Sequence, residues 1–319
     1  MTAQALTRRS PVAAWFAENG ALAALVMLVV ALSLLSADFL SVTNLLNVGV
    51  QAAVTAILAF GATFVIVTGG IDLSVGSVAA LSAIGLAWSS TVAGVPWPVA
   101  TLASLAIGVA CGLVNAILIA YGKLPPFIAT LAMLGIARGL ALVISRGSPI
   151  GMPEEVSRLG ETVGYLPVPL VVMVIMGVIA AVILNRTYPG RAMYAIGGNA
   201  EAARLSGINV SRQQLVTYAL AGGFAAVAGI VLASRLSSAQ PQAAAGYELD
   251  AIAAVVIGGA SLSGGKGKAL GTFIGALILA VLRNGLNLLS VSAFWQQVVI
   301  GVVIALAVLV DTLRRRGTY

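Results

Sequence analysis

The sequence predicts an all-α fold, a polytopic transmembrane helix bundle of about ten spans with its N- and C-termini in the cytoplasm. Composition, long apolar segments and the placement of basic residues each support this class. Of the 319 residues, 60% are hydrophobic and 8% are charged, whereas a soluble domain has about 25% charged residues. We therefore expect an integral membrane protein that forms a single transmembrane domain over residues 1–319.

Apolar segments that qualify or nearly qualify as membrane spans recur ten times along the chain. A transmembrane helix needs about 20 apolar residues to cross about 30 Å of hydrocarbon. The segments are rich in Ala, Gly and Val without period-2 alternation, which favours helices over strands. The predicted spans are 21–37, 48–67, 75–93, 97–121, 126–145, 166–184, 215–234, 249–262, 269–289 and 293–310. Segment 249–262 is short enough for a re-entrant half-helix, but the charge distribution favours a crossing.

Lys and Arg collect in alternate connections, which sets the orientation. With the N-terminus inside, twelve basic residues fall in cytoplasmic segments and three in outer ones, and such an excess marks the cytoplasmic side. The larger cytoplasmic parts are the N-terminal segment 1–20, the loop 185–214 and the tail 312–319, while 146–165 forms an outer loop. Membrane topology thus explains the net charge of +7 better than nucleic-acid binding does.

Residue usage excludes several kinds of chemistry. The chain has no His and one Cys, Cys111, so a His-based triad, a disulfide within the chain and a thiolate-rich metal site are ruled out. The stretch "ASLSGGKG" at 260–267 lacks the first Gly and the final Ser or Thr of a nucleotide-binding P-loop. We therefore expect no enzymatic activity, no metal and no cofactor on this chain.

Asp72, in "VTGGIDLSVGS", is the only acidic residue between Ser41 and Ser148. In one hypothesis the glycines end a helix and Asp72 or Ser74 caps the next one. In the other, the helix is broken at depth and Asp72 faces a solute path. The stretch "GGASLSGG" matches "GGIDLSVG" at five of eight positions, so we expect breaks at both Gly69–Gly76 and Gly258–Gly265.

The stretch "GGNAEAARLSGI", from Gly197 to Ile208, predicts a short helix inside the cytoplasmic loop. Asn199 suits its N-cap, Glu201 lies in the first turn, where the helix dipole favours an anion, and Gly207 suits the C-terminal turn. At about two turns it is too short to be stable alone in water. It needs a docking surface, either on the spans or on a partner.

Five stretches, taken together, resemble the permease subunit of bacterial ABC importers for ribose, xylose and related monosaccharides. They are "TGGIDLSVGS", "LPPFIATLAML", "GGNAEAARLSGI", "GGASLSGGKG" and "FWQQVVIGVVI", in this order between about Phe39 and Asp311. The resemblance implies a multi-pass protein of the bacterial cytoplasmic (inner) membrane. It also implies three kinds of partner: an ATP-binding cassette subunit that holds ATP and magnesium, an extracytoplasmic sugar-binding protein, and a second permease copy or paralogue.

The resemblance further implies that the short helix is a coupling helix seated in a groove of the ATPase. Its coupling residues are Asn199, Glu201, Ala202, Ala203, Arg204 and Gly207. Glu201, Ala202, Ala203 and Gly207 match the family's motif, whereas Thr217 stands where Ile is usual and no Leu-Pro follows. The alternative is a solvated basic connection without a partner.

A neutral solute rich in hydroxyl groups calls for amides, hydroxyls and aromatic faces along its path. The candidate path residues are Asp72, Gln51, Asn115, Asn284, Asn287, Trp295, Gln296 and Gln297. Amides also join helices to one another in membranes, so each of these has a structural alternative. Arg138 is expected to point into the bundle and to pair with carbonyl groups or Asp72. The outer loop, with Glu154, Glu155, Arg158 and Glu161, is a candidate docking face for the binding protein.

Two other functions remain open at this point. A secondary transporter driven by a proton or sodium gradient usually carries ionisable groups inside its bundle, and few are present here. An importer of the same family carrying a nucleoside or another small solute would share the same motifs. The sequence names neither the sugar nor the composition of the permease pair.

Overall fold

The computed structural model describes residues 20–316 as a bundle of helices with four two-residue strands. Most of the predicted N-terminal segment 1–20 and residues 317–319 of the tail lie outside the described residues. The helices are α2 (Gly20–Leu35), α3 (Val42–Val67), α4 (Val75–Ala87), α5 (Trp97–Ala120), α6 (Pro126–Ser145), α7 (Glu154–Ser157), α8 (Val168–Arg186), α9 (Tyr188–Gly198), α10 (Ala200–Leu205), α11 (Val210–Arg235), α12 (Tyr247–Ile257), α13 (Ala269–Leu288) and α14 (Ala293–Arg316). A π-helical turn η1 (Trp88–Val92) extends α4, and a 3₁₀ turn η2 (Arg158–Gly160) follows α7.

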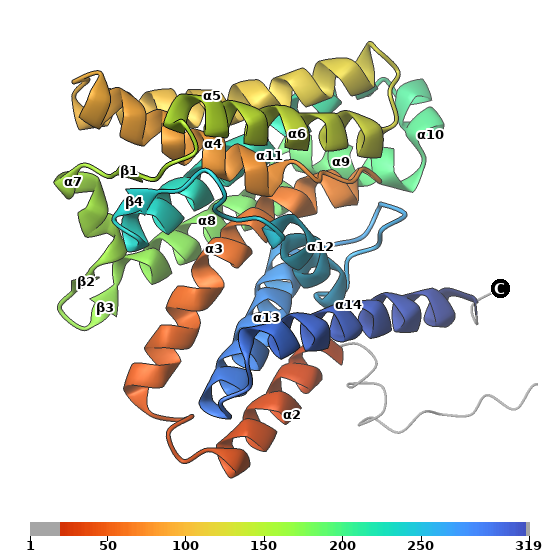
Figure 1. Ribbon diagram of the computed structural model, residues 1–319. Helices are drawn as coiled ribbons and strands as arrows, with labels where there is room; N and C mark the ends of the chain where they lie inside the picture. Colours follow the sequence, from red (N-terminus) through yellow and green to blue (C-terminus); the bar gives the residue numbers. More distant parts are fainter. Residues whose placement is uncertain (1–19, 317–319) are drawn as a thin grey trace, which may run out of the picture.

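The strands belong to the connections. Strand β1 (Ile150–Gly151) pairs antiparallel with β4 (Ser238–Ala239), and β2 (Thr162–Val163) pairs antiparallel with β3 (Leu166–Pro167). Figure 1 shows α7 and these strands at one end of the bundle and α10 at the opposite end. The two long connections predicted from the sequence therefore lie on opposite sides, as the charge distribution requires.

Seven helices are long and apolar enough to cross a membrane: α3, α4 with η1, α5, α6, α8, α11 and α13. Helix α2 and the apolar part of α14 within the searched residues are shorter. Nine of the ten predicted spans coincide with a helix and the eighth overlaps the short helix α12, so the all-α membrane bundle is confirmed. The total of ten crossings and the side of each terminus stay predictions.

Helix α3 forms the centre of the bundle, and its most apolar window is 89% buried. It packs against α8, α11, α12 and α13. By contrast, 22–33% of the corresponding windows of α5, α6 and α8 is buried, and side chains such as Leu102, Ile136 and Val178 face outward. An apolar outer surface on long helices is the surface that a lipid bilayer covers.

Small residues allow α5 and α11 to pack closely. A Cβ atom on Gly108 would overlap the carbonyl oxygen of Gly222, and one on Gly222 would overlap that of Gly108. Gly112 meets the backbone of Tyr218 in the same way. Such close approach is how transmembrane helices gain van der Waals contact without a hydrophobic driving force.

The eighth predicted span is neither a full helix nor a re-entrant turn. Helix α12 has 11 residues, which gives about 16 Å and is too short to cross. The segment 236–246 before it contains β4 and runs back from the strand end of the bundle, where the Met152 amide donates to the Ser237 carbonyl at 3.1 Å. The turn after α12 contacts the end of α9 at the opposite side. An extended segment and a short helix together therefore connect the two ends of the bundle.

Arg138, on α6, supplies hydrogen bonds to the extended segment. Its Nη1 donates to the carbonyl oxygens of Pro241 at 2.6 Å and Ala243 at 2.8 Å. Non-helical backbone inside a membrane protein needs such partners because no lipid group can replace them. The prediction that Arg138 points inward and pairs with carbonyl groups is confirmed.

Candidate functional site

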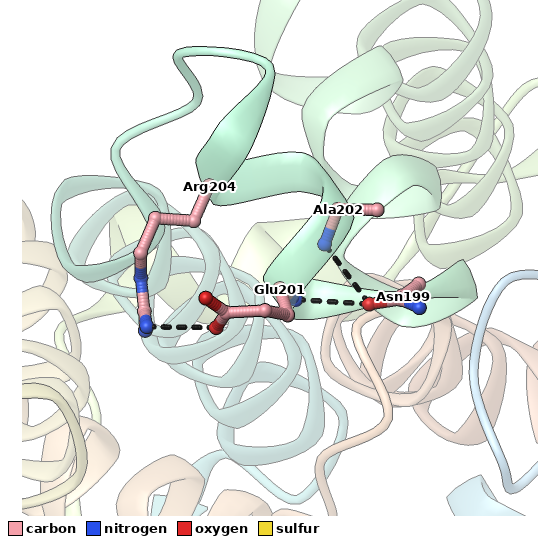
Figure 2. A network of polar contacts seen from close by, with 4 residues as sticks. All are labelled: Asn199, Glu201, Ala202 and Arg204. Carbon is pink, nitrogen blue, oxygen red and sulfur yellow. Dashed lines mark hydrogen bonds and ion pairs between the residues drawn. The ribbon is translucent and has the colours of Figure 1, made fainter.

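The short helix α10 has the local structure that its sequence predicts. The Asn199 side-chain oxygen accepts hydrogen bonds from the amides of Glu201 and Ala202, both at 3.0 Å (Figure 2). Glu201 pairs with Arg204 at 3.0 Å on the exposed surface, a contact that adds little stability because water screens it. Gly207, with φ +86°, closes the C-terminal turn.

Helix α10 presents most of its surface to the outside of the chain. Ala203 is its one buried residue, whereas the side chain of Leu205 is 82% exposed. Leu205 lies outside the candidate membrane spans, so lipid does not account for its exposure. Five of the six residues of α10 are exposed, so most of the surface of this helix is available for a contact.

The end of α9, immediately before α10, rests on two turns of the bundle. A Cβ atom on Gly197 would overlap both the carbonyl oxygen of Val67, at the end of α3, and the amide nitrogen of Gly265, after α12. The Gly265 amide in turn donates to the Val67 carbonyl at 2.9 Å. We call this contact of three backbone segments the glycine joint, formed by Val67, Gly197, Gly264 and Gly265.

A tyrosine on α9 adds a second contact to the glycine joint. The Tyr194 hydroxyl donates to the Gly267 carbonyl at 2.7 Å. Partial burial raises the pKa of the Tyr194 phenol above its ordinary value. Because a phenol is neutral below its pKa, this hydrogen bond persists across the physiological pH range.

The two turns in the joint have the same backbone construction. After α3, Gly69 and Gly70 donate to the carbonyls of Ile66 and Val65 at 2.9 and 3.0 Å. After α12, Gly259 and Ala260 donate to those of Val256 and Val255 at 2.9 and 3.1 Å. Both are Schellman-type C-caps, with φ +82° at Gly69 and φ +90° at Gly259. The five-of-eight sequence match therefore has a structural counterpart.

Asp72 closes the first turn and does not cap α4 directly. Its Oδ1 accepts hydrogen bonds from the Ser74 amide at 2.8 Å and the Ser74 hydroxyl at 2.6 Å. Ser74 is the N-cap residue of α4 but makes no side-chain cap bond. In the second turn, Ser261 accepts from the Ser263 amide at 3.2 Å. Both predicted breaks are thus connections between separate helices, in which Asp72 and Ser261 have the same role.

Replacing Asp72 by serine should preserve this turn, whereas alanine should destabilise the protein. Serine retains an acceptor for the Ser74 amide, as Ser261 does for Ser263, but alanine leaves a buried donor unpaired, at a cost of about 1–3 kcal/mol. Thermal unfolding of the detergent-purified protein measures the difference. Asp38→Ala, at an exposed position, should leave the midpoint unchanged; equal midpoints for the two Asp72 variants would contradict the assignment.

The predicted path residues do not converge on one site. The Asn115 side-chain amide donates to the Ser74 hydroxyl at 3.0 Å, beside Asp72. Asn284 forms a reciprocal amide pair with Asn44 on α3, at 3.0 and 2.8 Å. Gln296 donates to Asn287 at 2.7 Å and joins α14 to α13. The side chain of Trp295 is 66% exposed and Gln297 is also exposed.

Gln51 alone among these residues lines a polar cavity. The other polar residues there are Thr55, Arg235, Tyr247, Asp250 and Arg283, none of which is among the predicted path residues. Arg235, Tyr247 and Asp250 sit at or near span ends, where charges and tyrosines are ordinary. Only the packing of α3, α11, α12 and α13 brings these residues to one cavity, and apolar patterning does not reveal such packing.

The outer loop is folded against the end of α11. Gly160 lies so close to the Ser234 carbonyl that a Cβ atom would overlap it. Glu154 pairs with Arg158 at 2.8 Å, and both side chains are exposed together with Glu155 and Glu161. The charged face proposed for docking is therefore accessible at the end of the bundle opposite α10.

Comparison with known proteins agrees with the pattern of motifs. The family model described as "Branched-chain amino acid transport system / permease component" matches residues 44–308. The ribose import permease protein RbsC of Escherichia coli (strain K12) is 47% identical, over 99% of this chain and 100% of its own length. The protein of the same name from Bacillus subtilis (strain 168) is 49% identical, over 90% of each chain.

A more distant relative is the xylose transport system permease protein XylH of Haemophilus influenzae (strain ATCC 51907 / DSM 11121 / KW20 / Rd). It is 36% identical over 87% of this chain and 91% of its own length. No solved structure matches at the significance applied to the other comparisons. The chain therefore belongs to this family of transport-system permease components.

Proposed function

We propose that this chain is the membrane-spanning permease subunit of an ATP-driven importer, a multi-pass protein of the inner membrane. It provides the translocation pathway for a monosaccharide such as ribose or xylose, which an extracytoplasmic binding protein delivers. The observation that carries the proposal is near-full-length similarity to ribose import permeases, 47% over 99% of the chain. The bundle crosses the membrane ten times, with both termini in the cytoplasm.

Helix α10 is the coupling helix in this proposal. Its coupling residues contact an ATP-binding cassette subunit, which holds ATP and magnesium. These residues are Asn199, Glu201, Ala202, Ala203, Arg204 and Gly207. The exposed Leu205 supports this assignment because an apolar side chain outside the lipid region gains stability when a partner covers it. The permease itself binds no cofactor and hydrolyses no ATP.

The glycine joint gives the coupling helix a direct route to the spans. The backbone of α9 contacts the end of α3 and the turn before α13, so displacement of α10 is passed to both helices. Backbone-to-backbone contact suits this role because it contains no flexible side chain. Rigid-body movement of packed elements is a common form of such switching.

Two alternatives differ in energy source or solute. The comparisons do not favour a transporter driven by a proton or sodium gradient, since the chain is a permease component of a different class of system. An importer of the same family that carries a nucleoside or another small solute would use the same coupling arrangement. The permease pair consists of two copies of this chain or of this chain with a paralogue.

The proposal is tested by uptake of labelled ribose into proteoliposomes that contain this chain and its ATP-binding subunit. With the binding protein outside and ATP inside, uptake is expected and should survive an uncoupler. Vesicles loaded with ADP serve as the control. Uptake that continues without ATP and stops with an uncoupler would support the gradient-driven alternative instead.

A further inference from the structure

A groove of about 510 Å³ lies between helices α4, α5 and α6, at the end of the bundle opposite α10 (Figure 1). Its lining consists of Gly85, Trp88 and Ser89 from α4 and η1, Ala103 and Ile107 from α5, and Val143, Ile144 and Arg146 from the end of α6. Its volume lies within the roughly 300–1,000 Å³ of ligand sites. The hollow of about 450 Å³ between α5, α8 and α11 has only apolar residues in its lining. The groove differs from this hollow because it carries a cation.

The inner part of the groove is apolar. A Cβ atom on Gly85 would overlap the Ile107 side chain, so the missing side chain lets Ile107 pack onto α4. Val143, on α6, is 73% exposed. The most apolar windows of α5 and α6 are 33% and 28% buried, so the outer faces of these helices meet the acyl chains of the bilayer. Hydrocarbon is therefore the molecule that suits this part of the groove.

The outer end of the groove offers hydrogen-bond donors and a positive charge. Within the described part of the chain, the Arg146 guanidinium and the Trp88 indole N–H have no hydrogen-bond or ion-pair partner. The Ser89 hydroxyl donates to the Leu86 carbonyl at 3.1 Å, which leaves its oxygen free to accept. No acidic side chain lines the groove. An unpaired guanidinium beside an N–H donor suits a phosphate group, which Arg binds through two parallel hydrogen bonds.

The depth of this outer end matches that of lipid headgroups. Trp88 and Ser89 open the π-helical turn η1, in which the Ala93 amide donates to the Trp88 carbonyl at 3.0 Å; such turns are frequent at functional sites. Trp88 and Trp97 stand on either side of the connection from η1 to α5, and each is 43% exposed. Exposed Trp residues collect at the boundary between membrane and water. The donors therefore lie at the headgroup level, and the apolar part extends into the hydrocarbon.

We propose that the groove binds one anionic phospholipid, with an acyl chain against Ile107 and Val143 and its phosphate on Arg146 and Trp88. Each part of such a lipid meets the part of the lining that suits it. Basic pockets between transmembrane helices bind anionic headgroups in this way. The inference depends on the membrane location of the bundle but not on its solute or energy source, so it is independent of the proposed function.

Native mass spectrometry of the full-length, detergent-purified protein tests the proposal. The probes are dioleoyl phosphatidylglycerol, which is anionic, and dioleoyl phosphatidylcholine, in which the choline group neutralises the phosphate. One phosphatidylglycerol should stay bound under conditions that remove phosphatidylcholine. Arg146→Gln should weaken phosphatidylglycerol binding about fivefold, the effect of one basic residue beside an anionic lipid. Arg158→Gln removes another exposed arginine of the same loop, outside the groove, and should have no effect.

A second pair of variants tests the apolar part of the site. Ala103→Trp places a bulky side chain in the groove and should abolish retention of the lipid. Ala110→Trp adds the same side chain at an exposed position about two turns further along α5, outside the groove, and should retain it. The unfolding midpoint of each variant in lipid-free detergent checks that it is folded.

Equal binding of the two lipids, or equal binding by Arg146→Gln and Arg158→Gln, would overturn the proposal. If inorganic phosphate raises the unfolding midpoint as much as phosphatidylglycerol does, the site is a simple anion site and the lipid assignment is wrong. Size-exclusion chromatography tests the remaining occupant. A parental dimer that only Ala103→Trp dissociates would assign the groove to a second copy of the chain. None of these measurements depends on ribose uptake, so their failure leaves the proposed function untouched.

Discussion

Replacing Gly197 by alanine is expected to lower ATP-driven uptake at least about tenfold. The added methyl group would overlap backbone atoms of Val67 and Gly265 at once, and backbone cannot rotate away as a side chain can. Either α9 moves off the glycine joint or the two turns separate. In both cases displacement of α10 no longer reaches α3 and α13 together.

Gly198→Ala is the control, because a Cβ atom at Gly198 meets nothing within 4 Å. It should leave uptake unchanged and add a little helix stability. Uptake and ATP hydrolysis are measured with the same reconstituted complex. Hydrolysis that continues while uptake stops identifies uncoupling, whereas normal uptake by Gly197→Ala would show that the joint does not transmit movement.

Arg138→Leu is expected to destabilise the protein by several kcal/mol. The change removes both hydrogen bonds to the carbonyls of Pro241 and Ala243. Each backbone group left unpaired within a membrane protein costs several kcal/mol. Arg138→Lys retains a charged donor group without the planar guanidinium fork and should lose less. Thermal unfolding in detergent and ribose uptake provide the two measurements.

Arg158→Leu supplies the comparison, since it removes an exposed ion pair at the outer loop. Its unfolding midpoint should match that of the parental protein. If Arg138→Leu also unfolds at the parental temperature, the extended segment 236–246 does not depend on Arg138. If only Arg138→Leu has a lower unfolding midpoint, the extended segment 236–246 depends on the Arg138 side chain.

Much of the bundle can be predicted from the sequence because the residues at helix ends have recognisable preferences. Asn199 predicts the start of α10 and Gly207 its end, and both are found as expected. The apolar segments predict α5 and α6 closely, whereas α3 begins six residues before its predicted start at 48. The pairing of Arg138 with carbonyl groups also follows, since a charge in the middle of a span must find partners.

The parts that escaped prediction depend on contacts between distant segments. Residues 249–262 look like one short span, yet their last residues form a turn and the passage is completed by residues upstream of α12. Arg235 falls in a predicted outer connection and Arg283 within a predicted span, and only the tertiary structure brings them to one cavity. Asp72 or Ser74 was expected to cap the next helix; Ser74 is the N-cap residue of α4, and Asp72 accepts a hydrogen bond from the Ser74 amide in the preceding turn.

The small ladder between β1 and β4 has a mechanical implication. Ile150 is opposite Ala239, and Gly151 is opposite Ser238. The charged loop 146–165 is therefore paired directly with the segment that leads into α12. Under the proposed function, a binding protein that moves this loop would move the segment leading to Tyr247 and Asp250 without touching either residue. Docking on one face of the bundle and movement of α12 would then be a single event.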